Sequence, residues 1–188
     1  GTDSWQLYPK DATFIHLDID GTEVGRNYEA IRLIGDARLT LDALADALGR
    51  ADLSLRKSAR TALESSILKA KEHYLKESES VRLSSQTPIR PERVMFELQK
   101  RLTPDSIVVA DASYSSIWIA NCLTSLSSGM RFITPRGLAG LGWGFPMALG
   151  AKVARPASEV FCLVGDGGFG HVWSELETAR RMGIKVTL

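Results

Sequence analysis

The stretch that decides the fold of this chain begins with Glu159-Val-Phe-Cys-Leu-Val164. It continues with Gly165-Asp166-Gly167-Gly168 and a helix-like run from His171 to Met182. Its first part has the apolar content of a strand buried in a parallel sheet. A glycine-rich turn that joins such a strand to a helix places one carboxylate and several backbone N–H groups at a single point. This arrangement suits a metal ion bridged to a phosphorylated ligand. The turn alone is equally consistent with a solvated Asp166 in a tight connection.

Strand-like and helix-like runs alternate along the rest of the sequence. This alternation predicts an α/β fold with a parallel sheet flanked by helices on both faces. Pro91 stands where a helix can begin, and Thr40 is expected to cap another helix whose leucines recur at helical spacing. Further strands are expected at residues 13–19, 31–34, 106–110, 131–134 and 185–188, and helices at 41–48, 54–76, from 91 onward, 115–126 and 144–154.

Three loops follow expected strands, and ligands of parallel sheets bind at the carboxyl ends of the strands. In the loop Asp111–Ser116, hydroxyl and N–H groups before a helix can hold an anion, although a serine N-cap explains them as well. In the loop 137–144, four glycines let the backbone approach a flat ligand, with Leu141 as an apolar prop. A crowded packing corner would have the same composition. The third loop is the Gly-Asp-Gly turn after Val164.

The composition is that of an ordinary globular protein, with 188 residues, 44% hydrophobic residues and a formal charge of +1. This balance favours neither nucleic acid nor a membrane as a partner. Cys122 and Cys162 each lie in an apolar segment and are expected to be reduced, buried thiols, which favours a cytoplasmic location. Histidines occur only at positions 16, 73 and 171, without metal-binding spacing, so we expect them to be structural or solvated. No apolar run has the length of a membrane span, and the first residues do not form a signal peptide.

Taken together, these motifs resemble a known family. The run Gly-Leu-Ala-Gly-Leu-Gly-Trp-Gly-Phe-Pro-Met-Ala-Leu-Gly-Ala-Lys (137–152), followed by Val-Gly-Asp-Gly-Gly-Phe (164–169), is similar to the diphosphate-binding domain of thiamine diphosphate enzymes. The branch it resembles is acetolactate synthase-like and also contains pyruvate oxidase, benzoylformate decarboxylase and glyoxylate carboligase. Residues 14–20, 23–28 and 35–41 look like the end of that family's central, Rossmann-like domain. The resemblance therefore implies three parts: the end of a central domain at 1–50, a helical linker at 51–88 and the start of the diphosphate-binding domain at 89–188.

The resemblance also implies roles for individual residues. Asp166 would be the first Mg²⁺ ligand, and the backbone around it would meet the diphosphate. Ala139, where the family often has glycine, would offer its carbonyl to the aminopyrimidine, and Leu141 would hold the cofactor in a bent shape that brings its amino group to the reactive thiazolium carbon. The residues expected to bind the cofactor are Tyr114, Ser115, Ala139, Leu141, Gly165, Gly167 and Gly168.

The family pattern continues beyond this chain in both directions. A second metal-binding Asn would follow Leu188, and the activating Glu belongs to a domain that would precede Gly1. We therefore expect an inactive fragment, without catalytic side chains of its own, of a polypeptide roughly three times as long. The parent is expected to be a carboligase or decarboxylase of 2-keto acids that uses thiamine diphosphate and Mg²⁺ and forms a homo-oligomer, either a dimer or a tetramer.

Two alternatives remain at this point. Asp18, Ile19, Asp20 and Asp36 lie where some relatives hold FAD or ADP, so the chain could be a nucleotide-binding module, and FAD is possible in the parent. The other alternative is a structural fragment that dimerises through its apolar helices. Apolar surface and unpaired strand edges left by missing domains would favour such self-association.

Overall fold

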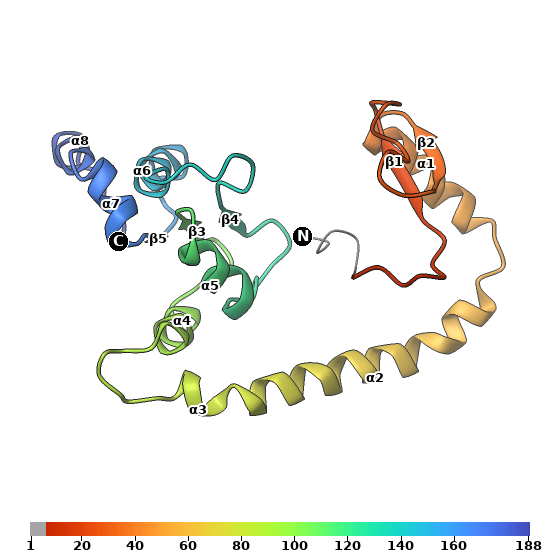
Figure 1. Cartoon of the computed structure of the whole chain (residues 1–188), viewed down its shortest axis with the longest axis horizontal. Coiled ribbons are helices and arrows are strands. Elements are labelled where there is room, and N and C mark those ends of the chain that lie inside the picture. Colours follow the sequence, from red (N-terminus) through yellow and green to blue (C-terminus); the bar gives the residue numbers. More distant parts are fainter. Residues whose placement is uncertain (1–6) are drawn as a thin grey trace. The chain divides into compact units, whose positions relative to one another are not determined.

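The computed structural model describes residues 7–188, and the chain divides into two compact units between Ala70 and Lys71. The helix α2 (Ser54–Glu77) runs across this division and links the two units in the chain (Figure 1). The expected helix at 54–76 therefore forms almost as predicted. The short helix α3 (Glu79–Arg82) follows it.

In the part that the structure describes, the first unit contains two parallel strands, one complete helix and the first turns of α2. Strand β1 (Ile15–Asp18) pairs with β2 (Ile31–Ile34), with Ile15 opposite Ile31 and Asp18 opposite Ile34. The expectation that 13–19 forms a buried strand is wrong in its burial, because the Ile15 side chain is 61% exposed. Within the part of the chain that the structure describes, this strand pairs with β2 alone, so little of the apolar surface on its two faces is covered.

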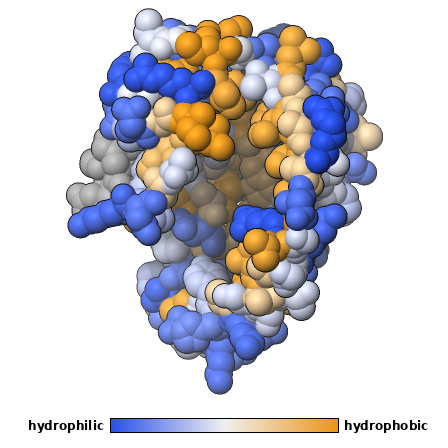
Figure 2. All heavy atoms as spheres, turned by 90° about the vertical axis from the view of Figure 1, so that its right-hand side faces the viewer, coloured by the Kyte–Doolittle hydropathy of each residue, from blue (hydrophilic) through white to orange (hydrophobic). Residues whose placement is uncertain are grey.

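The helix of the first unit begins earlier than predicted. Helix α1 spans Ala37–Gly49, and Asp36, not Thr40, is its N-cap because the Asp36 carboxylate accepts a hydrogen bond from the Leu39 backbone N–H at 3.0 Å. Asp is among the residues preferred at this position. The leucine stripe of α1 forms as expected, but none of its residues is buried. Large hydrophobic side chains accordingly reach the surface of the chain (Figure 2).

The second unit is built on a three-stranded parallel sheet with the order β4-β3-β5. The central strand β3 spans Ile107–Ala110, and its neighbours are β4 (Arg131–Ile133) and β5 (Val160–Leu163). Helices α4 (Pro91–Gln99) and α5 (Tyr114–Cys122) pack on one face of this sheet, and α6 (Gly144–Ala154) packs on the other (Figure 1). The predicted α/β fold, a parallel sheet flanked by helices, is thus confirmed.

The core of this unit follows the alternation of side chains along β3. Ile107 and Val109 point to one face and pack with Ala148 and Ala151 of α6. Val108 and Ala110 point to the other face, into a cluster with Met95 of α4 and Ile119 of α5. A strand with apolar residues at every position, as β3 has, is what a parallel sheet covered on both faces requires.

The C-terminal part differs from the prediction in two places. The helix expected at 171–182 is instead two helices, α7 (Asp166–Val172) and α8 (Glu175–Arg181). Glycines have low helix propensity, so the start of α7 within the Gly-Asp-Gly turn reflects tertiary packing. The strand expected at 185–188 is reduced to one bridge, in which Thr187 exchanges backbone hydrogen bonds with Val160 and Cys162 of β5 at 2.9 and 2.8 Å.

The helix expected at 115–126 is also shorter, because the chain turns extended at Leu123, directly after α5. Among the residues that the structure describes, no helix is both long and apolar enough to cross a membrane.

Candidate functional site

The candidate site lies at the carboxyl edge of the three-stranded sheet. The strands are parallel, so the loops after Ala110, Ile133 and Leu163 all leave the sheet at the same edge. These are the three loops in which the sequence placed candidate ligand contacts. The parallel topology therefore brings them to one end of the second unit.

Asp111 ties the first two loops together. Its side chain is 0% exposed, and its Oδ2 accepts a hydrogen bond from the Gly142 N–H at 2.9 Å. Its Oδ1 accepts from the N–H groups of Trp143 at 3.1 Å, Gly144 at 3.3 Å and Ala112 at 2.8 Å. A buried carboxylate is stable only when such donors replace water. We call this set of contacts the Asp111 junction.

The third loop closes on the same carboxylate. A Cβ atom added to Gly168 would lie 2.0 Å from Asp111 Oδ2, so only glycine fits at that point of α7. A Cβ added to Gly144 would likewise lie 2.9 Å from the Asp111 backbone nitrogen. All three loops therefore meet at the Asp111 junction, and two of the glycines there are required by close approach.

The sequence reasoning missed this role of Asp111, which it treated only as the start of an anion-binding loop. The sequence feature that could have indicated it was a single carboxylate directly after a wholly apolar strand, in a chain with a glycine-rich loop whose N–H groups need acceptors. Burial also raises the pKa of the Cys162 thiol to about 12, and the negative charge of Asp111 adds to this shift. Cys162 is therefore an inert thiol of the core, as expected from the sequence, whereas Cys122 is only partly buried.

The expected phosphate-binding residues occupy the first turn of α7. Gly165 is its N-cap residue, and the Phe169 N–H donates to the Gly165 carbonyl at 2.9 Å. Among the described residues, nothing accepts a hydrogen bond from the N–H groups of Asp166, Gly167 and Gly168. Free N–H groups at this place are typical of a helix start and are suited to an anion.

Leu141 lies beside this turn. Cβ atoms added to Gly167 and Gly168 would be 3.8 and 3.6 Å from the Leu141 side chain, which is itself 49% exposed. The structure thus brings together the proposed apolar prop and the proposed phosphate loop. An open hollow of about 540 Å³ adjoins Leu141 on the side of Pro146 and Met147.

Tyr114 and Ser115 form the start of α5 at the same edge. Tyr114 is 71% exposed, whereas Ser115 is buried. Both line a hollow of about 260 Å³ together with Leu163 and Val164 at the end of β5. The first and third loops therefore share a hollow. Ala139 is exposed and adopts a positive φ of 54°.

A metal ion at this edge would have one acidic side chain available. Within the part of the chain that the structure describes, no group of three or more His, Cys, Asp and Glu side chains could hold a metal ion. The exposed Asp166 carboxylate at the start of α7 is nevertheless the donor type that Mg²⁺ uses when phosphate oxygens and water complete its shell.

The other polar candidates have local contacts. The His16 Nδ1 accepts from the Gly25 N–H at 3.1 Å, and His73 pairs with Glu77 at 3.2 Å. Among the acids considered for a nucleotide, Asp18 accepts from the Asp20 N–H at 2.9 Å, and Asp20 accepts from the Thr22 N–H at 2.8 Å. The hydrogen bond from Thr22 lowers the pKa of Asp20.

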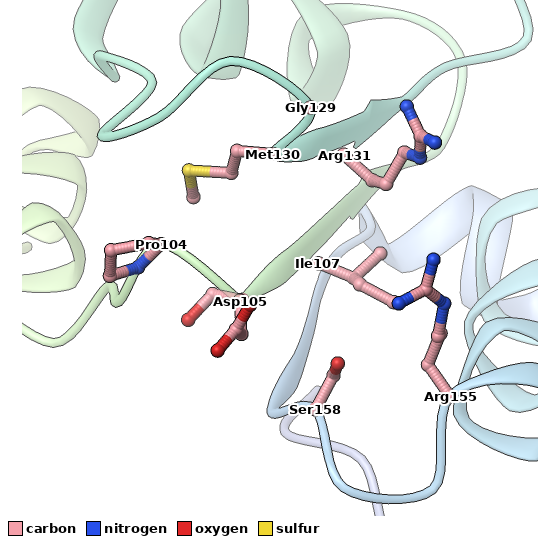
Figure 3. A pocket seen from close by; sticks show the side chains of 9 residues that line it. Pro104, Asp105, Ile107, Gly129, Met130, Arg131, Arg155 and Ser158 are labelled. Carbon is pink, nitrogen blue, oxygen red and sulfur yellow. The ribbon is translucent and has the colours of Figure 1, made fainter.

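A separate small hollow lies at the opposite, amino edge of the sheet. It has a volume of about 60 Å³ and is lined by residues at the starts of β3 and β4 and after α6. Figure 3 shows Arg131, Arg155 and Asp105 around it. Because it is at the end of the strands away from the three loops, we do not assign it to the candidate site.

Comparison with known proteins gives a consistent result. Residues 111–188 match the family described as "Thiamine pyrophosphate enzyme, C-terminal TPP binding domain". The chain is 31% identical to a probable acetolactate synthase large subunit of Methanocaldococcus jannaschii, over 97% of this chain and 31% of that protein. It is 30% identical to the acetolactate synthase large subunit of Buchnera aphidicola, over 100% of this chain and 32% of that protein. The chain thus spans about a third of the length of these relatives.

Proposed function

The chain belongs to the thiamine diphosphate-dependent enzyme family, in its acetolactate synthase-like branch, and on this premise we propose that the carboxyl edge of its second unit binds thiamine diphosphate together with Mg²⁺. The observation that carries the proposal is the Asp111 junction, which holds the three loops of the edge against one another. In line with the family's organisation, we assign the diphosphate-binding domain to 89–188, the helical linker to 51–88 and the end of the central domain to 1–50.

The start of α7 would hold the charged end of the cofactor. The N–H groups of Gly167 and Gly168 point out of an uncapped first turn, where the helix favours negative charge. Asp166 would supply its carboxylate to Mg²⁺, and the cation in turn would neutralise the diphosphate. Gly165 precedes this turn as its N-cap residue, and its backbone would lie beside the diphosphate. Tyr114 and Ser115 would contact the same group from α5.

The second loop would hold the rings. Leu141 would place its side chain against the middle of the cofactor, and the Ala139 carbonyl would accept a hydrogen bond from the aminopyrimidine. When bound, the cofactor supplies a carbon nucleophile and an electron sink for 2-keto acids. The residues of this chain bind and orient that group, and we assign none of them a proton-transfer role.

For the whole protein we propose a carboligase or decarboxylase acting on 2-keto acids, as a homodimer or homotetramer. The names of the relatives support the carboligase reading, because they are acetolactate synthase large subunits. FAD or ADP binding by the first unit is the less supported alternative, since Asp18, Asp20 and Asp36 accept hydrogen bonds from their own turns.

Calorimetric titration of the chain with thiamine diphosphate tests the proposal without requiring activity. We expect binding that depends on Mg²⁺ and that weakens about tenfold or more in Asp166→Ala. Asp105→Ala is the matched control, because Asp105 is an exposed acid at the other edge of the same sheet. Binding that does not require Mg²⁺, equal loss in both variants, or no binding at all would contradict the proposal.

A further inference from the structure

The second unit contains a cavity that the proposed cofactor site does not use. It has a volume of about 360 Å³ and lies between the last turns of α2, helix α3 and helices α4 and α5. Cys122 and Asn121, which help to line it, are at the C-terminal end of α5, whereas Tyr114 and Ser115 of the candidate cofactor site are at the other end. Its size falls within the range of small-molecule sites.

Hydrogen bonds fix the walls of this cavity. The Tyr74 hydroxyl donates to the Asn121 carbonyl at 3.3 Å and so joins α2 to α5. The Gln99 side chain bonds to both backbone groups of Thr124, at 2.7 and 3.3 Å, and so joins the end of α4 to the segment after α5. The Arg82 guanidinium donates to the Leu75 carbonyl at 2.6 Å. Most polar groups of the wall are therefore occupied, and a ligand would meet a pre-formed surface.

One wall is aromatic. The Phe96 ring lies in the cavity lining, with the Arg82 guanidinium 5.4 Å and the Lys100 ammonium group 4.1 Å from its centroid. Leu75 and the ring of Tyr74 add apolar surface. A planar aromatic ligand can stack on such a wall, since offset aromatic pairs and guanidinium–ring contacts are both favourable.

The charge of the lining favours an anion. Glu92 is already paired with Arg90, with contacts of 2.9 and 3.2 Å, and this hydrogen-bonded pair lowers the pKa of Glu92. Lys71 has no ion pair or hydrogen bond with any residue that the structure describes. The lining holds two cations, Lys71 and Arg82, against the one acid Glu92, so its net charge is positive, and Lys71 is the group with free donors.

We propose that this cavity binds a small aromatic carboxylate, with its ring against Phe96 and Tyr74 and its carboxylate at the Lys71 ammonium group. Cys122 lines the same cavity and provides a local reporter. The inference does not depend on the proposed cofactor site, because it uses none of the residues of the carboxyl edge.

Alkylation of the two cysteines in the whole chain tests the proposal, with 2-naphthoate as the probe. Burial, and to a lesser extent the charge of Glu92, raises the pKa of the Cys122 thiol. Since only the thiolate reacts, the reaction with iodoacetamide is run at about pH 10 and is followed by mass spectrometry of each cysteine. Cys162 is the internal control, because burial raises its pKa to about 12 and it should remain unmodified. We expect saturable protection of Cys122 by 2-naphthoate and little protection by the uncharged 2-naphthalenemethanol.

Two lysine variants test the contribution of the Lys71 charge to binding. Lys71→Met should raise the concentration needed for half-protection about threefold or more, whereas Lys76→Met, on the same helix but outside the cavity lining, should leave it unchanged. No protection of Cys122, or equal protection in Lys71→Met and the unaltered chain, would overturn the proposal. If Cys122 reacts too slowly to follow, equilibrium dialysis of labelled 2-naphthoate against the same variants gives the same decision.

Discussion

Replacing Asp111 by Asn tests the idea that one buried carboxylate organises the carboxyl edge. The two side chains have nearly the same shape, but Asn exchanges one acceptor oxygen for an NH₂ donor. Placed with its oxygen at the Oδ1 position, Asn keeps the contacts to Ala112, Trp143 and Gly144 and turns its NH₂ toward the Gly142 N–H. The flipped orientation is worse, because the NH₂ would then face three donors.

The magnitude follows from these contacts. The better orientation loses one hydrogen bond to a charged acceptor, about 1.5–3 kcal/mol, and leaves the buried Gly142 N–H without a partner, which costs about 1–3 kcal/mol. Removing a buried charge offsets part of this loss. We therefore expect Asp111→Asn to lower the free energy of unfolding by about 2–4 kcal/mol.

Urea unfolding followed by tryptophan fluorescence is a suitable assay, because Trp118 and Trp143 both lie in the second unit. With a slope of about 2 kcal/mol per molar urea, in the middle of the usual range, the midpoint should fall by about 1–2 M. The control Asp105→Asn changes an exposed acid at the opposite, amino edge of the same sheet and should stay within about 0.5 kcal/mol. A midpoint for Asp111→Asn equal to that of the control would refute the junction as an organising contact.

Two further predictions concern the same unit. Gly168→Ala should destabilise this unit by about 2 kcal/mol or more, because the new Cβ would overlap Asp111 Oδ2. Gly167→Ala should be tolerated, because its Cβ would meet only Leu141 at 3.8 Å. Equal urea midpoints for the two variants would count against this packing. Stability should also fall as pH rises above about 9, by up to about 1.4 kcal/mol per pH unit, because Cys162 keeps its proton up to a pKa of about 12 in the folded state but loses it near 9 in the unfolded state. Urea midpoints at two alkaline pH values measure this fall, which should be smaller in Cys162→Ala.

Much of the fold follows from local sequence patterns. Pro91 opens α4 as expected, and the strand at 31–34 forms with the predicted bounds, because proline and the flanking polar residues mark these boundaries strongly. The start of α7 could not be read in this way, since its residues Asp166 to Gly170 have poor helix propensity. It depends on the contact between Gly168 and Asp111, which are far apart in the sequence.

The same distinction between local patterns and long-range contacts applies to the site. The three loops could be placed at one edge because parallel strands share their carboxyl ends. The role of Asp111 could not be predicted, because its partners are the N–H groups of Gly142, Trp143 and Gly144, and no local pattern links them to it. The strand at 13–19 was wrongly expected to be buried for a related reason. An apolar run shows that a segment can be buried, but it does not show how much of the segment other elements cover.

The backbone around the Asp111 junction links packing to function. Among the described residues other than glycine, only Ser113 and Ala139 have positive φ values, 69° and 54°. Ser113 follows Asp111 in the first loop, and Ala139 precedes Gly142 in the second. Each is therefore close in the chain to a backbone N–H group, that of Ala112 or of Gly142, which donates to the Asp111 carboxylate. Such conformations cost about 1–3 kcal/mol each and persist only where the surrounding contacts fix them. The buried carboxylate supplies that constraint, which explains how strained loops can keep a defined shape at an edge where most side chains remain open to solvent.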